Sequence, residues 1–244
     1  MRQVLHLLPV TPAHACPYIP HRIARDRGFT VEQISSEAWE SLLNSGWRRA
    51  GAMIYEPVCP LCQQCIPLRL PVGRLTWNRT QRKCVRRNAD VEVRITEVQD
   101  TDERADLYAR YITTRHTGMM SGSRREFRHF LCISPVDTVE VEYRVSGRLL
   151  AVGTVDRLPG GWSCVYCYYD PDESRRSLGT LNVLRTAELC REQCPAGDEA
   201  FLYLGYWVPG SDTMDYKRRF HPYQVLGRDG HWHERHDAGF DPIA

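Results

Sequence analysis

The chain has 244 residues, 42% of them hydrophobic and 25% charged, and a formal net charge of +2. Such a composition can bury a core and is ordinary for a soluble protein, and at about 100–200 residues per domain the length allows one large domain or two small ones. No apolar run approaches the ~20 residues that cross a bilayer, and the opening segment is too short and too weakly apolar for a signal peptide. We therefore expect no membrane partner. Ten cysteines without an export signal indicate a reducing, cytoplasmic compartment.

The first elements form a small cysteine-rich N-terminal module, which we predict to span residues 1–75. Apolar residues at helical spacing predict a helix over residues 36–45, which ends at a glycine. Residues 52–55 and 66–70 read as strands on either side of a turn that holds three cysteines. The module is too small and irregular to depend on a large core of its own.

The cysteines of this module are its most informative feature. Three of them have the spacing Cys-x-x-Cys-x-x-Cys, and a fourth precedes them. A thiolate at every third residue lets one turn of backbone aim several sulfurs at one point, as in tetrahedral zinc sites and iron–sulfur clusters. We therefore predict a site for zinc or an iron–sulfur cluster, with the ligands Cys16, Cys59, Cys62 and Cys65.

Basic residues are unevenly distributed in spite of the small net charge. Residues 74–94 contain seven Arg or Lys residues against two acidic ones, and shorter basic clusters lie at 124–128 and 217–219. Such runs indicate surfaces that meet phosphate or carboxylate. The alternative for any one run is a set of solvated surface arginines.

Residues 76–244 are predicted to form one mixed domain of helices and strands. A basic helix or turn near 81–87, a strand at 91–95 and a helix at 102–115 come first. A hairpin at 138–145 and 149–155 and a third strand at 162–169 follow. A loop at 170–179 then leads into a helix at 180–192 and a strong strand at 201–207. We interpret this order as an α+β fold of the acetyltransferase-like (GNAT) type, a mixed sheet with helices.

Several segments, taken in order and spacing, carry a family resemblance. They are CPYIP at 16–20, LNSGWRR at 43–49, YEP at 55–57, the cysteine turn at 59–65, Arg69, the basic run at 81–88, YYDP at 168–171, SLG at 177–179, YLGYW at 203–207 and MDYKRRFHP at 214–222. Together they resemble the aminoacyl-tRNA–protein transferases, which include arginyltransferases and bacterial aspartate/glutamate leucyltransferases. The short length and the cysteine spacing are most similar to the bacterial leucyl-transferring branch.

The resemblance implies a transfer reaction. Leucine passes from leucyl-tRNA to the α-amine of a protein whose first residue is Asp or Glu, and the product is marked for degradation in the N-degron pathway. The reaction is aminolysis of an activated ester, so the site must position both reactants, keep the amine neutral and stabilise the oxyanion. The expected partners are leucyl-tRNA and proteins with acidic N-termini. The choice of leucine over arginine as donor rests on the resemblance alone.

The acidic side chain of the acceptor requires cations, since an arginine fork that holds a carboxylate discriminates against uncharged groups. We assign binding of this side chain first to the run after the last predicted strand, Tyr216, Lys217, Arg218 and Arg219. The second candidates are two earlier arginines, Arg48 and Arg49. The alternative is salt bridges to surface acids. For catalysis we select Asp170, to orient the amine, and Tyr168, which could stack on the terminal adenine or line a leucine pocket. Helix capping and sheet core are their respective alternatives.

The tRNA requires phosphate contacts. We assign these to one basic helix and to the start of another, where backbone N–H groups favour phosphate: Arg82, Lys83, Arg86 and Arg87, and Arg175 and Arg176. In acetyltransferases the second loop ends in a small residue, and Leu181 stands there instead, so we expect no coenzyme A. Two other functions stay open, a coenzyme A-dependent N-acyltransferase and a metal-containing nucleic-acid-binding module.

Overall fold

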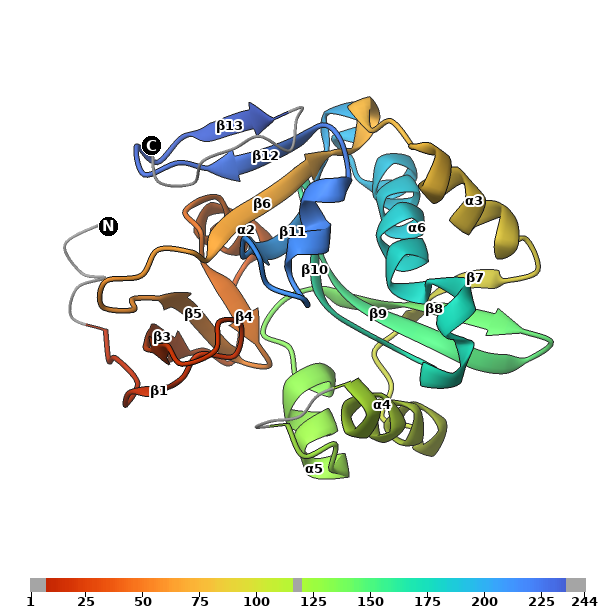
Figure 1. Cartoon of the computed structure of the whole chain (residues 1–244), viewed down its shortest axis with the longest axis horizontal. Coiled ribbons are helices and arrows are strands. Elements are labelled where there is room, and N and C mark those ends of the chain that lie inside the picture. The colour runs from red at the N-terminus through yellow and green to blue at the C-terminus, as the bar shows by residue number, and fades with distance from the viewer. Residues whose placement is uncertain (1–7, 116–119, 236–244) are drawn as a thin grey trace.

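An eight-stranded sheet forms the centre of the computed structural model, which describes residues 8–115 and 120–235 (Figure 1). The strands lie in the order β13-β12-β6-β11-β10-β9-β8-β7, and only β10 and β11 pair in parallel. The sheet with its helices confirms the predicted α+β class. The strands are β6 (Ile66–Pro71), β7 (Glu92–Glu97), β8 (Thr138–Val145), β9 (Arg148–Leu158), β10 (Gly161–Tyr169), β11 (Phe201–Trp207), β12 (Tyr223–Leu226) and β13 (Trp232–Arg235).

The central strands lie where the alternating pattern predicts them. The predicted hairpin is β8 and β9, and its turn residues Ser146 and Gly147 both have positive φ, 48° and 83°, as a tight hairpin turn requires. The strands predicted at 66–70, 91–95, 162–169 and 201–207 are β6, β7, β10 and β11.

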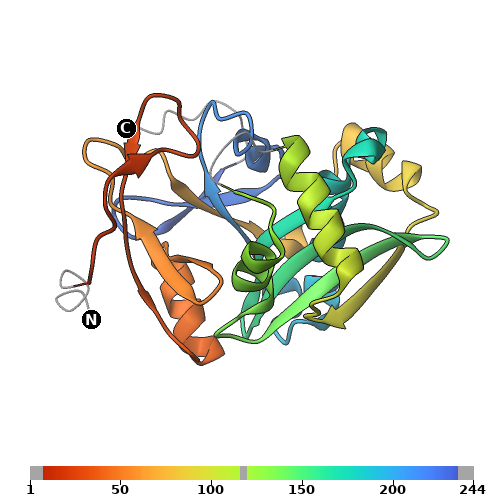
Figure 2. The same ribbon diagram turned by 90° about the horizontal axis from the view of Figure 1, so that it is seen from below.

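Helices cover both faces of this sheet, as Figure 2 shows from below. On one face α3 and α6 pack together over a core that includes Leu70, Val141 and Leu184. On the other face α4 and α5 cover Val152 and Tyr168. All four predicted helical segments are confirmed, with the bounds α2 (Ser36–Asn44), α3 (Arg79–Arg87), α4 (Asp102–Arg115) and α6 (Leu178–Gln193), and α5 spans Arg124–Phe127.

The N-terminal part contains two small sheets of its own. β1 (His14–Ala15) pairs with β2 (Ile23–Ala24), and β5 (Met53–Pro57) lies between β3 (Asp26–Thr30) and β4 (Arg48–Ala50). The cysteine turn follows β5, and β6 then enters the large sheet between β11 and β12. Residues before and after position 75 therefore share one sheet. A division into two domains at this position stays a prediction.

Some features have no counterpart among the expected elements. These are the short strands β3 and β4, the β12–β13 hairpin and a 3-10 helix, η5 (Asp215–Arg219), that follows β11. The opening residues 1–7 of the segment assessed as a signal peptide lie outside the described part of the chain. Among the described helices none is long and apolar enough to cross a membrane.

The parallel strands β10 and β11 separate part of the way along their length. They pair only at Gly161↔Phe201, Trp162↔Leu202 and Ser163↔Tyr203. Beyond this point both strands have an irregular register, β10 against β9 and β11 against β6. Gly205, at the irregularity of β11, has φ of 79°, a conformation that favours glycine. The η5 helix packs against β11 beyond the point where the two strands diverge.

Candidate active site

Two cations from opposite ends of the chain converge beside Gly205. The ammonium group of Lys217, on η5, donates to the carbonyl of Tyr206 at 2.7 Å. The guanidinium group of Arg48, on β4, donates to the carbonyl of Gly205 at 3.4 Å and lies 5.3 Å from the ring centroid of Tyr206. A Cβ atom at Gly205 would lie 3.6 Å from Lys217 Nζ and 3.9 Å from Arg48 Nε. We call Arg48 and Lys217 the cation pair.

The cation pair is buried without a counter-charge. Each side chain is 6% exposed, and neither forms an ion pair with any carboxylate in residues 8–115 or 120–235. Burial lowers the pKa of both, and burial together with Arg48 lowers the pKa of Lys217 to about 7. Nε of Arg48 is buried and has no hydrogen-bond partner. Because unpaired buried charge is costly, this arrangement suits an anion that a ligand supplies.

Arg49, the neighbour of Arg48 in sequence, is already fully engaged. Its guanidinium group binds both carboxylate oxygens of Asp156, at 2.8 and 2.5 Å, and the hydroxyl of Thr138 at 3.1 Å. Trp39 Nε1 donates to the same carboxylate at 3.0 Å. Arg49 therefore ties β4 to β9. Arg48 instead donates to backbone carbonyls, with Nη1 at 2.5 Å from Trp47 and 3.3 Å from Leu43, so of the two candidate arginines only Arg48 lacks a carboxylate partner in the described residues.

The other predicted acceptor contacts on η5 differ in their availability. Arg218 is paired with Asp215 at 3.1 Å, and Arg219 is exposed. Tyr216 is partly buried, and its pKa is raised by burial and by Cys167 and other groups of β10. Tyr216 packs against the main core while Lys217 contacts β11, so η5 is held by both of these residues.

The two predicted catalytic residues lie apart from the cation pair in their contacts. Asp170 is 1% exposed, and its carboxylate binds Arg110 at 2.7 Å and Arg148 at 3.2 Å. The same carboxylate accepts from the N–H of Asp172 at 3.1 Å and so caps η3 (Pro171–Arg176). Tyr168 is fully buried under α4, where its ring meets that of Tyr108 edge-on at 5.7 Å. In these contacts the structure brings neither residue to Gly205, and a catalytic role for Asp170 and Tyr168 stays a prediction.

Exposed cations line the outer face of α3. None of these side chains forms an ion pair with a described carboxylate; they are Arg82, Lys83, Arg86 and Arg87. Arg87 donates to the backbone carbonyl of Arg175, and the side chain of Arg175 is also exposed. We call these five residues the basic surface. Arg176, by contrast, is paired with Asp90 and Glu173 at 2.8 and 3.0 Å.

The basic surface is connected to η5. Asn78 and Gln81 form a reciprocal capping box at the start of α3. The side-chain amide of Gln81 also donates to the carbonyl of Arg219 at 2.9 Å. The helix that carries the exposed cations is therefore held against the helix that carries Lys217.

The four predicted metal ligands gather at the cysteine turn. Burial, and then the thiols of Cys59, Cys16 and Cys62, raise the pKa of Cys65 to about 12. Thiolates are the right chemistry for zinc or iron. In the described part of the chain, however, no group of three or more His, Cys, Asp or Glu side chains is placed to hold a metal ion. As positioned, the thiols do not make a complete ligand set.

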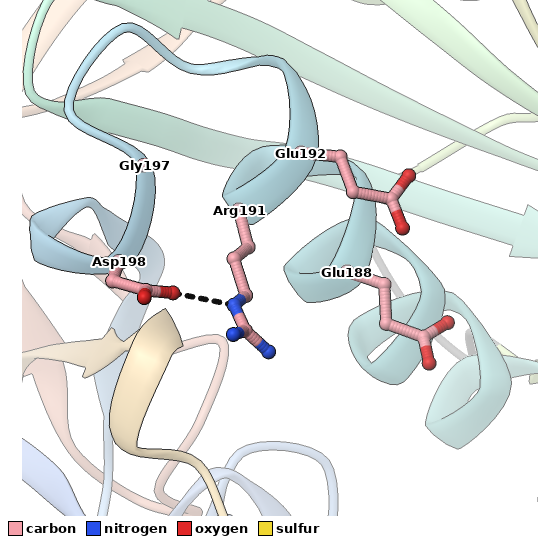
Figure 3. Close-up of a pocket in the computed structure, with 5 residues that line it drawn as sticks. All are labelled: Glu188, Arg191, Glu192, Gly197 and Asp198. Carbon is pink, nitrogen blue, oxygen red and sulfur yellow. Dashed lines mark hydrogen bonds and ion pairs between the residues drawn. The ribbon is translucent and has the colours of Figure 1, made fainter.

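Among the cavities on the surface of the described residues, two bear on the choice of a site. One of about 570 Å³ lies between the cysteine turn and the β12–β13 hairpin, and we call it the hairpin cavity. The other, of about 450 Å³, lies at the C-terminal end of α6 (Figure 3). There Arg191 points to Asp198, while Glu188 and Glu192 point away from both, so the site is acidic and unsuited to phosphate or carboxylate. The hairpin cavity is lined by Ser45, Gly46, Cys65, Pro67, Tyr206 and Leu226, among others.

Comparison with known proteins gives consistent results. The family models described as arginine-tRNA-protein transferase, N terminus, and arginine-tRNA-protein transferase, C terminus, match residues 14–83 and 103–227. A Stenotrophomonas maltophilia protein named aspartate/glutamate leucyltransferase is 40% identical over 234 residues, 92% of this chain and 91% of its own length. A protein of the same name from Saccharophagus degradans is 38% identical over 226 residues, 91% of this chain and 94% of its own. The solved structure of FemX covers 72% of this chain and 61% of its own, with 9% identity and a TM-score of 0.47.

Proposed function

This chain belongs to the arginine-tRNA-protein transferase family, and from that premise we propose that it transfers leucine from leucyl-tRNA to the α-amine of proteins that begin with Asp or Glu. The observation that carries the acceptor half of this proposal is the cation pair. Arg48 and Lys217 are buried and lack a carboxylate of the protein's own in the described residues. The side chain of an N-terminal Asp or Glu supplies one.

The cation pair also explains how uncharged N-termini are rejected. A carboxylate between a guanidinium and an ammonium group gains charge-assisted hydrogen bonds to both. An acceptor that begins with Ala or Asn leaves the two buried charges as unpaired as they are in the free protein. Sites built around buried polar groups discriminate strongly against analogues that cannot satisfy them.

The same cations assist the chemical step. The α-amine must be neutral to attack the ester carbonyl carbon, and its usual pKa is about 8. Nearby positive charge disfavours the ammonium form and lowers this pKa. Attack forms the new C–N bond, and collapse of the tetrahedral intermediate breaks the C–O bond to the ribose. The amine loses one proton, and the ribose oxygen gains one. No side chain is acylated, so the task of the protein is positioning and electrostatic stabilisation.

The separation of β10 and β11 supports an acetyltransferase-like arrangement for this reaction. The strands part after a short parallel segment, and η5 places Lys217 at that point, so the reactants would meet at this edge of the two strands. We propose that the tRNA end lies toward the basic surface, which Gln81 connects to η5. The absence of coenzyme A as a donor stays a prediction, which a thermal-shift titration with acetyl-CoA checks.

The basic surface leads to a testable expectation for tRNA. Lys83→Glu together with Arg86→Glu should raise KM for leucyl-tRNA and reduce its salt dependence by about one unit of log–log slope per lost phosphate contact. KM for an acceptor peptide should be unchanged. Arg94→Glu is the matched control, because Arg94 is exposed but already paired with Glu92 at 2.6 Å. Equal salt slopes in both variants would show that RNA binds elsewhere.

The overall reaction is tested with both charged tRNAs. Labelled leucine should pass from leucyl-tRNA to peptides that begin with Asp or Glu and not to peptides that begin with Asn or Ala. Arginyl-tRNA should be a poor donor in the same assay. Transfer to neutral and acidic N-termini at equal rates would contradict the assignment of the cation pair.

We also propose that the cysteine turn holds zinc or an iron–sulfur cluster, with Cys16, Cys59, Cys62 and Cys65 as ligands. Metal analysis and a visible absorption spectrum of protein purified without oxygen distinguish the two. Cys59→Ser should lower metal content and the melting temperature, because the thiols lie in the small N-terminal part of the chain. If Cys59→Ser instead preserves stability and abolishes the transfer step, the cysteines act directly in the chemistry and this assignment is wrong.

A further inference from the structure

We propose that the hairpin cavity binds the acceptor polypeptide beyond its first residue. This proposal rests on the proposed function, since it extends the acceptor site that begins at the cation pair. The occupant is the stretch of polypeptide that follows an N-terminal Asp or Glu, bound in an extended conformation.

The cavity is adjacent to the cation pair, and the two share one residue, Tyr206. Tyr206 lines the cavity, its carbonyl accepts from Lys217 at 2.7 Å, and its ring lies 5.3 Å below the guanidinium group of Arg48. Its hydroxyl donates to the carbonyl of Gly46 at 2.8 Å, and Gly46 lines the cavity as well. Extended chain advances about 3.3–3.6 Å per residue. A peptide whose acidic side chain reaches the cation pair therefore has its next residues beside Tyr206 and the cavity.

The lining of the cavity suits polypeptide better than RNA. The lining carries both signs of charge: Glu56 pairs with Arg27 at 2.6 Å, Asp229 pairs with His233 at 2.9 Å, and Arg228 and Arg235 line the cavity as well. RNA would meet two carboxylates there, whereas the basic surface offers five exposed cations and no carboxylate of its own. The cavity volume of about 570 Å³ is in the ordinary range for a ligand site.

The mixed lining also fits a substrate whose sequence varies after the first residue. Prolines and leucine alternate with neutral polar groups and backbone around the cavity, as at Pro67, Leu226 and Ser45. A surface of this kind contacts peptide backbone and accommodates many side chains without selecting one charge. Specificity then comes from the first residue at the cation pair, and additional affinity comes from the chain that follows.

The experiment compares kcat/KM for two acceptors, a dipeptide amide and a six-residue peptide, both beginning with Asp. In the unmodified protein the longer peptide should react with a kcat/KM higher by about tenfold, the equivalent of about 1.4 kcal/mol of added binding. Ser45→Trp places a large side chain in the cavity and should reduce kcat/KM of the longer peptide to that of the dipeptide.

Ser41→Trp is the matched control. Ser41 lies one turn earlier on the exposed side of α2 and does not line the cavity, so this variant should keep the full preference for the longer peptide. Equal kcat/KM for both peptides in the unmodified protein overturns the proposal. So does a Ser45→Trp variant with raised KM for leucyl-tRNA and an intact peptide preference, which identifies the occupant as RNA. Failure of the proposed function appears separately, as equal reaction of dipeptides that begin with Asp and with Ala.

Discussion

Arg48→Met should lower kcat/KM for acceptors that begin with Asp or Glu by a factor between about 30 and about 4,000. Removing one partner from a buried, hydrogen-bonded charge contact costs about 2–5 kcal/mol, and each 1.4 kcal/mol is a factor of about ten. The substitution keeps an unbranched apolar stem and removes a buried charge that has no carboxylate partner in the described residues. It also removes the hydrogen bonds of Nη1 to the carbonyls of Leu43 and Trp47, so chemical denaturation is needed to check that the fold is retained. The measurement is transfer of labelled leucine to peptides that differ only in the first residue.

The neighbouring arginine provides the control for this prediction. Arg49→Met removes the partner of the buried Asp156 carboxylate, which should lower the free energy of unfolding by about 3–5 kcal/mol. Chemical denaturation should thus separate two adjacent arginines, one that affects acceptor choice and one that affects stability. If Arg48→Met retains the preference for Asp over Ala, the acceptor carboxylate binds elsewhere.

Lys217→Met should abolish selective transfer and at the same time stabilise the protein below pH 7. Burial, and then Arg48, lower the pKa of Lys217 from 10.5 to about 7, while Cys164 and Cys65 act in the opposite direction. Between pH 7 and 10.5 the unfolded chain holds a proton that the folded chain has released, so stability rises with pH across this window. Below pH 7 Lys217 is protonated in both the folded and the unfolded chain, so the free energy of unfolding is reduced by the full penalty of burying the ammonium group.

The measurement is the melting temperature as a function of pH. The variant lacks the buried ammonium, so its melting temperature at pH 6 should exceed that of the unmodified protein, by about 2–4 °C for each 1 kcal/mol gained. The lost hydrogen bond to the Tyr206 carbonyl offsets about 1 kcal/mol of the gain. The difference between the two proteins should shrink as pH rises above 7. Parallel curves would mean that Lys217 does not titrate as described.

The regular elements of the fold were predictable, because long alternating and helical patterns carry strong local signals. The hairpin β8–β9 and the helices α4 and α6 are of this kind. The short strands β3, β4, β12 and β13 have at most five residues, too few for a pattern to stand out. The entry of β6 between β11 and β12 depends on pairing with residues far away in sequence, which no local pattern reports.

The sequence indicated which residues were candidates for the site, but not which of them lie close together. Lys217 and Arg48 both stood among the candidates, but so did Arg49. Successive residues of a strand face opposite sides, so the two arginines had to differ. Which one is engaged depends on Asp156, which lies 107 residues away from Arg49 in sequence. For Asp170 the local signal is the same whether it caps a helix or orients an amine, and no local pattern reports its contacts with Arg110 and Arg148, which come from distant elements.

The position of β6 has a consequence for biosynthesis. Leu68 pairs with Gly205 and Pro67 with Tyr206. The strand that follows the cysteine turn therefore pairs with β11, whose residues lie in the last fifth of the chain. A nascent chain on the ribosome therefore cannot bring Arg48 together with Gly205 and Lys217 until translation is nearly finished. Pairing across so long a separation also tends to slow folding, so the cation pair is assembled among the last features of the fold.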